Sequence, residues 1–215
     1  MLFISRPYFF ACRFEISIFI FDISTPVGHS RLQALQATHN FIVSVISLLV
    51  SAFLPNCPET VIAMLATSSI GVIFTSCSPD FGEEGIIDRF GQCEPSILIA
   101  CDGYGYGGKI FDIRKKVLGI SKKLQSLKKT ILVNHASIGD IENFENWEEL
   151  IAENMSEEIH FVRLPFMAPL YILYSSGTTG KPKCIVHSAG GALLQHIKEH
   201  KYHCNIKRDD RVLYF

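Results

Sequence analysis

Residues 171–187 hold two short apolar runs on either side of a polar loop, and they read YILYSSGTTGKPKCIVH. The apolar runs, Tyr171–Tyr174 and Cys184–His187, predict two strands. The nine residues between them contain two glycines, four hydroxyl side chains and two lysines. Glycine permits a positive φ and a close approach of the backbone to a ligand, consecutive N–H groups in such turns bind anions, and lysine adds a compact positive charge. The sequence therefore predicts a phosphate-binding loop here.

This loop differs from the P-loop of nucleoside triphosphatases. Its glycines, Gly177 and Gly180, are three residues apart, and no serine or threonine follows Lys181, whereas a P-loop has the pattern G-x-x-x-x-G-K-S/T. A flexible hairpin loop without a ligand is the alternative, because glycine, serine and threonine are ordinary turn residues. The residues taken alone leave both interpretations open.

Upstream of this loop, short apolar runs alternate with segments of helical pattern. Such alternation favours parallel strands joined by crossover helices. The sequence therefore predicts an α/β fold, a layered, mostly parallel sheet with flanking helices. The further strands are expected at residues 72–76, 96–101 and 130–133, with 45–54 as either a strand or the end of a helix. The helices are expected to begin at Asn56 and to cover 83–91, about 109–128, 143–152 and 189–200.

Several local features refine this pattern. Asn56 is placed to cap the helix that follows it, with Glu59 as its capping-box partner and Pro58 in the first turn. Gly71 is placed to end that helix. The glycine-rich stretch 102–108 is interpreted as a surface turn, because it lacks the G-x-G-x-x-G pattern between a strand and a helix that a nucleotide-binding loop requires.

Composition and charge exclude several classes of protein. The 215 residues include 20 Lys+Arg and 21 Asp+Glu, for a net charge of -1, which argues against a general nucleic-acid-binding protein because those carry a basic surplus. A hydrophobic fraction of 48% excludes a disordered chain. The seven cysteines include no C-x-x-C pair, which indicates neither a disulfide framework nor a zinc ribbon. Reduced thiols in a cytosolic compartment are the simplest interpretation.

The first 50 residues are poor in charge. Residues 41–54 form a run of 14 that only serines interrupt, which is shorter than the roughly 20 apolar residues of a membrane-spanning helix. A buried core segment is the favoured interpretation of this region. Contact with a membrane is one alternative, and a targeting peptide at the extreme N-terminus is another.

The run SSGTTGKPK, residues 175–183, resembles the signature S/T-S-G-S/T-T-G-x-P-K of the adenylate-forming superfamily, which contains acyl-CoA synthetases, luciferases and peptide-synthetase adenylation domains. The resemblance implies that this loop holds the β- and γ-phosphates of ATP. It gives this cofactor-binding role to Ser175, Ser176, Gly177, Thr178, Thr179, Gly180 and Lys183. Lys181 stands at the variable position of the signature, so its role is open.

Flanking segments narrow the resemblance to the acetoacetyl-CoA synthetases. They are residues 54–71, 76–98, 102–109 and, above all, 183–204. The resemblance implies that acetoacetate, or a similar short-chain carboxylic acid, reacts with ATP to give an acyl-adenylate and is then transferred to CoA, with Mg²⁺ bridging the phosphates. It also implies a cytosolic enzyme of lipid metabolism that has no nucleic-acid partner and is not expected to contact a membrane.

The resemblance divides the chain into two parts. Residues 1–50 are an unmatched apolar N-terminal segment, and 51–215 are a partial large AMP-binding domain, truncated at the C-terminus. Members of the group continue into a ribose-binding aspartate and a catalytic lysine beyond this point. The isolated 215-residue chain is therefore expected to have little or no ligase activity. A non-catalytic remnant of the family, or a gene-model fragment, is the alternative.

Three histidines are further candidates for site residues. His187 follows the second strand, where members of the group often have a histidine, so it is either a possible catalytic residue or a packed core histidine. His196 and His200 fit, with Glu199, the H-x-x-E-H pattern of inverted zinc peptidases, which is a minor alternative. A solvated helix face is favoured, and no metal site is predicted. The seven basic residues within 114–129 predict a sheet-covering helix with a basic face, with binding to a membrane surface or an anionic partner as the alternative.

Overall fold

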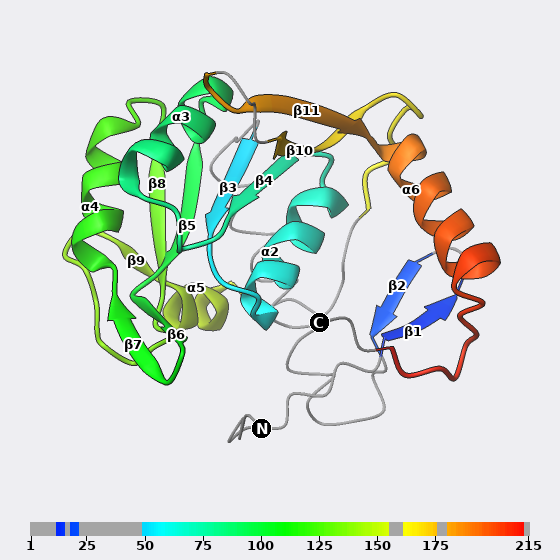
Figure 1. Cartoon of the computed structure of the whole chain (residues 1–215), viewed down its shortest axis with the longest axis horizontal. Helices are drawn as coiled ribbons and strands as arrows, with labels where there is room; N and C mark the ends of the chain where they lie inside the picture. The colour runs from blue at the N-terminus through cyan, green and yellow to red at the C-terminus, as the bar shows by residue number, and fades with distance from the viewer. Residues whose placement is uncertain (1–11, 16–17, 22–48, 155–160, 176–179, 213–215) are drawn as a thin grey trace. The chain divides into compact units, whose positions relative to one another are not determined.

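The computed structural model describes residues 12–15, 18–21, 49–154, 161–175 and 180–212 (Figure 1). The chain forms two compact units. One consists of Met1–Leu32 and Leu193–Phe215, and the other of Gln33–Ala192. The larger unit contains the sheet and the candidate site, and each unit is described by itself below.

A seven-stranded sheet organises the larger unit, with the strand order β11-β10-β4-β3-β5-β8-β9. Its neighbours pair in parallel, except that β10 and β11 are antiparallel. This arrangement confirms the predicted α/β class with a mostly parallel sheet. The strands are β3 (Leu49–Phe53), β4 (Ile73–Cys77), β5 (Ile97–Cys101), β8 (Lys129–Val133), β9 (Glu145–Asn146), β10 (Pro169–Ser175) and β11 (Lys183–Ser188).

Helices connect the strands and cover the sheet. In Figure 1, α3 and α4 stand side by side along it. The hydrophobic core joins the strands to buried residues of these helices, with Phe90, Ile120 and Trp147 among its largest fully buried side chains. The helices of this unit are α2 (Pro58–Ser69), α3 (Glu83–Cys93), α4 (Arg114–Lys123), α5 (Trp147–Glu153) and the first residues of α6 (Ala189–Lys198).

The central strands are buried along their whole length. All five residues of β3 and all five of β5 are buried, as expected for parallel strands with both faces covered. The polar Ser51 is tolerated in β3 because its hydroxyl donates to the Ile97 carbonyl at 3.0 Å. Within the apolar run 41–54, residues 49–53 therefore form a buried core strand, which agrees with the favoured interpretation of this run as a core segment. Residues 41–48 lie outside the described residues.

The start of α2 differs from the prediction. The helix begins at Pro58, and its N-cap is Cys57, which makes no side-chain capping bond, so Asn56 and Glu59 do not form the predicted capping box. The Thr60 hydroxyl donates instead to the Pro55 carbonyl at 2.8 Å. Pro58 does lie in the first turn, where its missing N–H leaves no bond unmade.

The predicted helix over residues 109–128 is too long at both ends. Lys109–Asp112 is a strand, β7, that pairs with β6 (Gly103–Tyr106) in an antiparallel hairpin. The two residues at its tip, Gly107 and Gly108, both have positive φ, which favours a tight hairpin over a helix start. The glycine-rich stretch is thus the first strand and the turn of a hairpin, and α4 begins only at Arg114.

The smaller unit contains a hairpin of β1 (Cys12–Glu15) and β2 (Ile18–Phe21), which are antiparallel. It also contains the end of α6, which stops at Lys198 rather than at the predicted His200 and continues as a π-helix over Glu199–His203. Among the described residues, no helix combines the length and the apolar character needed to cross a membrane.

Candidate nucleotide-binding site

The predicted phosphate-binding loop connects β10 to β11. These strands form an antiparallel pair in which Ser175 lies opposite Lys183, so the loop leaves and re-enters the sheet at one place. Residues 176–179, which carry four of the seven predicted phosphate ligands, lie outside the described residues. The structure describes the other three, Ser175, Gly180 and Lys183, and brings them to the two ends of the loop.

The described end of the loop has properties that fit an anion. Gly180 has φ +113°, and nothing lies within 4 Å of the position that a Cβ would take there. Lys183 is exposed beside Ser175 at the strand ends. Open backbone in a glycine conformation, with a hydroxyl and an unburied ammonium nearby, suits a phosphate group.

Lys181 is directed towards α3. Its ammonium lies 3.7 Å from the Asp88 carboxylate of α3. Next along the chain, the Pro182 carbonyl accepts a hydrogen bond of 2.9 Å from the Gln92 side chain of the same helix. The returning side of the loop is therefore held by α3, and Lys181 belongs to this support.

The strand that enters the loop is held by Tyr174. Its hydroxyl lies 2.9 Å from the Thr75 hydroxyl and 3.3 Å from the Cys93 sulfur. Burial raises the pKa of Tyr174 well above its ordinary value, so the side chain stays neutral at physiological pH. The Cys93 sulfur also lies 3.8 Å from the Cys184 sulfur of β11. Side chains of β10, β11 and α3 are therefore in contact next to the strand ends that carry the loop.

His187 lies in β11, opposite Tyr171 of β10. The two rings are 5.0 Å apart, and both side chains are half-buried. This contact is a packing arrangement within the hairpin. A catalytic role for His187 stays a prediction.

A pocket of about 340 Å³ lies elsewhere in the larger unit. It is lined by residues that follow the carboxyl ends of β3 and β4, together with the tip of β6. In open α/β sheets, ligands bind outside the carboxyl ends of the strands. None of the described residues of the predicted phosphate loop lines this pocket. No part in a site was predicted from the sequence for the lining residues 78–80, although their position after a parallel strand was a usable signal.

A lysine supports one wall of this pocket. The Lys116 ammonium donates to the carbonyls of Pro79 and Phe81, at 2.9 and 3.1 Å. Burial lowers the pKa of Lys116. Lys116 therefore fixes the turn after β4 and is not part of a fully solvated basic face.

Other basic residues of the 114–129 stretch are paired as well. Arg114 binds Asp112 with a shortest distance of 2.8 Å, Lys123 binds Glu83 at 2.8 Å, and Lys129 binds Glu145. These pairs neutralise part of the predicted basic face.

The H-x-x-E-H residues lie in α6 and the π-helix that follows. The rings of His196 and His200 are stacked, with centroids 6.1 Å apart. Glu199 accepts bonds from Lys198 and Gln195, at 3.0 and 2.7 Å, and the bond from Lys198 lowers its pKa. The carboxylate is thus engaged by neighbours on its own helix.

Comparison with known proteins places this architecture in a family. A profile described as AMP-binding enzyme matches residues 48–215. The chain belongs to the AMP-binding enzyme family. The match begins next to β3 and includes the whole β10–β11 hairpin with its loop.

Individual relatives agree with this assignment. The chain is 51% identical over 173 residues to acetoacetyl-coenzyme A synthetase of Rhizobium meliloti (strain 1021), and 42% identical over 175 residues to acetoacetyl-CoA synthetase of Gallus gallus. Each alignment covers 77% of this chain and 26% of the relative. The structure is also similar to acetoacetyl-CoA synthetase from Streptomyces lividans, with a TM-score of 0.79 and 37% identity over 83% of this chain and 28% of that one. The chain thus spans about a quarter of the length of these relatives.

Proposed function

We propose that this chain is part of an ATP-dependent acid–CoA ligase that activates acetoacetate. The observation that carries the proposal is the 51% identity to an acetoacetyl-coenzyme A synthetase over 77% of the chain. A malonamoyl-CoA synthetase of Penicillium aethiopicum is 38% identical. Acetoacetate and malonamate are both short acids with a second carbonyl group at the β-carbon, which supports a short-chain carboxylic acid as the substrate.

The proposed reaction has two steps. The acetoacetate carboxylate attacks the α-phosphorus of ATP, which gives acetoacetyl-adenylate and releases pyrophosphate. The CoA thiolate then attacks the acyl carbon and displaces AMP. Mg²⁺, when bound with the nucleotide, neutralises charge on the phosphates.

In this reaction the chain binds the triphosphate of ATP. We assign the β- and γ-phosphates to the loop of residues 175–183, in which Ser175, Gly180 and Lys183 stand at the two ends. Backbone N–H groups and hydroxyls of the loop donate to phosphate oxygens, and Lys183 adds positive charge. Donors that are fixed before the reaction need no rearrangement as charge develops on the leaving pyrophosphate.

We further propose that residues 51–215 are part of a large AMP-binding domain in a cytosolic enzyme. The family match, which covers residues 48–215, supports a boundary between the first residues and the sheet. Exposed apolar side chains on the β10–β11 pair, such as Leu173, Ile185 and Val186, offer a surface on which further parts of such a domain can pack.

The test uses this chain extended to the length of its relatives. ATP–pyrophosphate exchange is measured with acetoacetate, acetate and butyrate in turn, and acetoacetate is expected to give the fastest exchange. Joint replacement of Thr178, Thr179 and Lys183 by alanine is expected to slow exchange by at least about 100-fold, as for the removal of donors that stabilise developing charge.

The unfolding midpoint of the triple variant serves as its control, because it separates a loss of phosphate binding from a loss of folding. Exchange at the unaltered rate in the triple variant would overturn the assignment of the loop. The absence of exchange with every acid in the unaltered extended protein would favour a non-catalytic member of the family. The 215-residue chain alone is expected to form no acetoacetyl-CoA.

A further inference from the structure

Three side chains capable of binding a metal meet at the start of α2. They are Cys57, the N-cap of the helix, Glu59 in its first turn, and His135, two residues after the end of β8. Their ligand atoms, one per residue, all lie within 4.8 Å of one another. Across the residues that the structure describes, this is the only group of three or more histidine, cysteine or acidic side chains so arranged.

One carboxylate oxygen of this cluster has no hydrogen-bond donor within the part of the chain that the structure describes. Oε2 of Glu59 is buried and has no hydrogen-bond partner among the described residues. A buried carboxylate oxygen without a donor or cation is costly. No other buried side-chain nitrogen or oxygen in the described ranges is left in this way. A cation bound beside this oxygen would compensate its charge.

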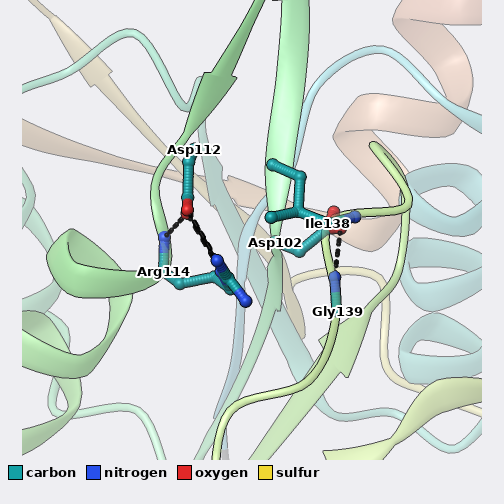
Figure 2. A network of polar contacts seen from close by, with 5 residues as sticks. All are labelled: Asp102, Asp112, Arg114, Ile138 and Gly139. Carbon is teal, nitrogen blue, oxygen red and sulfur yellow. Dashed lines mark hydrogen bonds and ion pairs between the residues drawn. The ribbon is translucent and has the colours of Figure 1, made fainter.

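The backbone that carries His135 is fixed by a buried aspartate. Asp102 is fully buried and accepts hydrogen bonds from the N–H groups of Ala136, Ile138 and Gly139, at 2.8, 2.6 and 3.4 Å. Figure 2 shows the carboxylate facing Ile138 and Gly139. The N–H of His135 itself donates to the Val133 carbonyl at 2.9 Å. The loop after β8 is therefore held in one conformation, as a ligand-bearing loop requires.

Cys57 is also positioned by local bonds. The Cys57 carbonyl accepts from the Thr60 N–H at 3.2 Å, and the Cys57 sulfur lies 3.3 Å from the Thr60 hydroxyl. Cys57 is buried and Glu59 half-buried, whereas His135 is exposed. The cluster is thus closed on the protein side and open to solvent at the histidine, which gives an ion a path of entry.

We propose that Cys57, Glu59 and His135 bind a zinc ion, with water as the fourth ligand. A thiolate, an imidazole and a carboxylate form a donor set that suits zinc, whereas Mg²⁺ and Ca²⁺ prefer oxygen ligands. With metal–ligand bonds of about 2.0–2.3 Å, the donor atoms of a tetrahedral site lie roughly 3.2–3.8 Å apart, so the ligands need to approach by about 1.5 Å at most. On binding, the Cys57 thiol loses its proton to solvent, the S–Zn bond forms, and no oxidation occurs.

The bound ion ties α2 to the loop after β8. It thereby links two segments that follow the carboxyl ends of β3 and β8. This role is structural and does not depend on the ligase activity. Because the ion binds the folded chain, zinc should raise the thermal midpoint in a concentration-dependent way.

The experiment uses the 215-residue chain after treatment with a chelator. Zinc is added back and, after removal of the free ion, bound metal is measured by mass spectrometry, with one zinc per chain expected. Cobalt(II) is used as a probe in parallel, because a thiolate ligand produces a sulfur-to-cobalt charge-transfer absorption. Cys57→Ser is expected to abolish that absorption, and His135→Gln to weaken zinc binding at least tenfold. His135 is exposed, so its replacement leaves folding intact, which the unfolding midpoint without metal verifies.

The chain offers a matched control in its other candidate zinc motif. The double variant His196→Gln and His200→Gln is expected to retain one zinc and the charge-transfer absorption unchanged. Less than about 0.1 zinc per unaltered chain would overturn the proposal. So would zinc that survives both Cys57→Ser and His135→Gln, or zinc that is lost only in the double-histidine control.

Discussion

The middle of the sheet and its β10–β11 edge have the same secondary structure but opposite exposure. In β3 and β5 every residue is buried. In β10 and β11, Leu173, Ile185 and Val186 are 44%, 45% and 58% exposed. Fully buried strands can hold the fold but cannot reach a ligand, whereas a strand pair at the edge can present a loop to solvent. Stability therefore resides in the middle strands, whereas the proposed nucleotide-binding loop is carried by the edge pair.

The largest effect should come from removing a side chain in the middle strands. Ile99 of β5 is fully buried, so Ile99→Ala is expected to cost about 2–5 kcal/mol of unfolding free energy, through lost burial and the cavity left behind. Ile185→Ala, the same substitution in β11, is expected to cost less than about 1 kcal/mol. Urea unfolding of both variants measures the two values.

Equal losses in the two isoleucine variants would contradict this comparison. They would mean that the edge is as well packed as the middle. In that case the exposed fraction of Ile185 would not describe its environment in solution.

A second pair of variants compares two aspartates near the β6–β7 hairpin. Asp102→Ala leaves three loop N–H groups without their acceptor, which should cost about 2–4 kcal/mol. Asp112 is exposed and binds Arg114 (Figure 2), and exposed ion pairs contribute little. Asp112→Ala should therefore change stability far less, and thermal unfolding at neutral pH compares the two.

The pH dependence of the Asp112 pair gives a check. Hydrogen bonds from Arg114 lower the pKa of Asp112, so any stabilisation by the pair is present above the ordinary aspartate pKa and is lost as the pH falls through the folded value. A small difference in unfolding free energy between Asp112→Ala and the unaltered chain is therefore expected at neutral pH, and it should disappear as the pH falls below about 4. A difference of similar size at pH 7 and pH 2 would show that the pair does not act through its charge.

The parallel sheet could be predicted from sequence because each strand is a local signal. The run ILIAC of β5 is apolar, the last three residues of KTILV in β8 are apolar and buried, and a helical pattern separates the two runs. Lys109–Asp112 was placed wrongly in a helix because the helical spacing of the apolar positions in α4 continues into it. Its real partner is β6, and the decisive signal was the Gly107–Gly108 turn.

The two candidate sites also differ in whether their residues are neighbours in the sequence. A nine-residue loop carries the phosphate-binding signature in one continuous stretch, so the sequence alone was enough to propose it, and the assignment stays a prediction. The Cys57–Glu59–His135 cluster joins residues that only folding brings together, and His135 is placed by the bonds of Asp102 to the loop. Neither a hydrophobic periodicity nor a short sequence motif indicates contacts between residues so far apart in the chain.

The buried thiols of the sheet should give a smaller effect, which appears in alkaline solution. Burial raises the pKa of Cys77 and of Cys101 to about 12, from an ordinary value of 9.0. Above pH 9 the unfolded chain releases these protons and the folded chain keeps them, so stability falls as the pH rises towards the folded pKa. The loss is about 1 kcal/mol for each thiol between pH 9 and pH 10.

Cys77→Ala tests this by removing one of the two contributions. Its unfolding free energy, measured from pH 8 to pH 10, should fall less steeply than that of the unaltered chain by about 1 kcal/mol. Cys204 is exposed, and Cys204→Ala should keep the original slope. Parallel curves for the unaltered chain and Cys77→Ala would show that the sheet interior does not hold this thiol neutral.

The smallest effect is expected at the edge itself, from Lys181→Ala. Lys181 lies in the predicted phosphate loop, but its side chain is 76% exposed and its ammonium lies 3.7 Å from the Asp88 carboxylate, so its charge is shared with α3. Loss of such a pair should change the unfolding free energy by less than about 0.5 kcal/mol. In the extended protein, Lys181→Ala should raise the KM for ATP less than about threefold. Lys183→Ala should raise this KM far more, because only Lys183 stands across from Ser175 at the loop ends. Steady-state kinetics of the two lysine variants separates them, and an equal loss in both would show that the loop uses the two cations together.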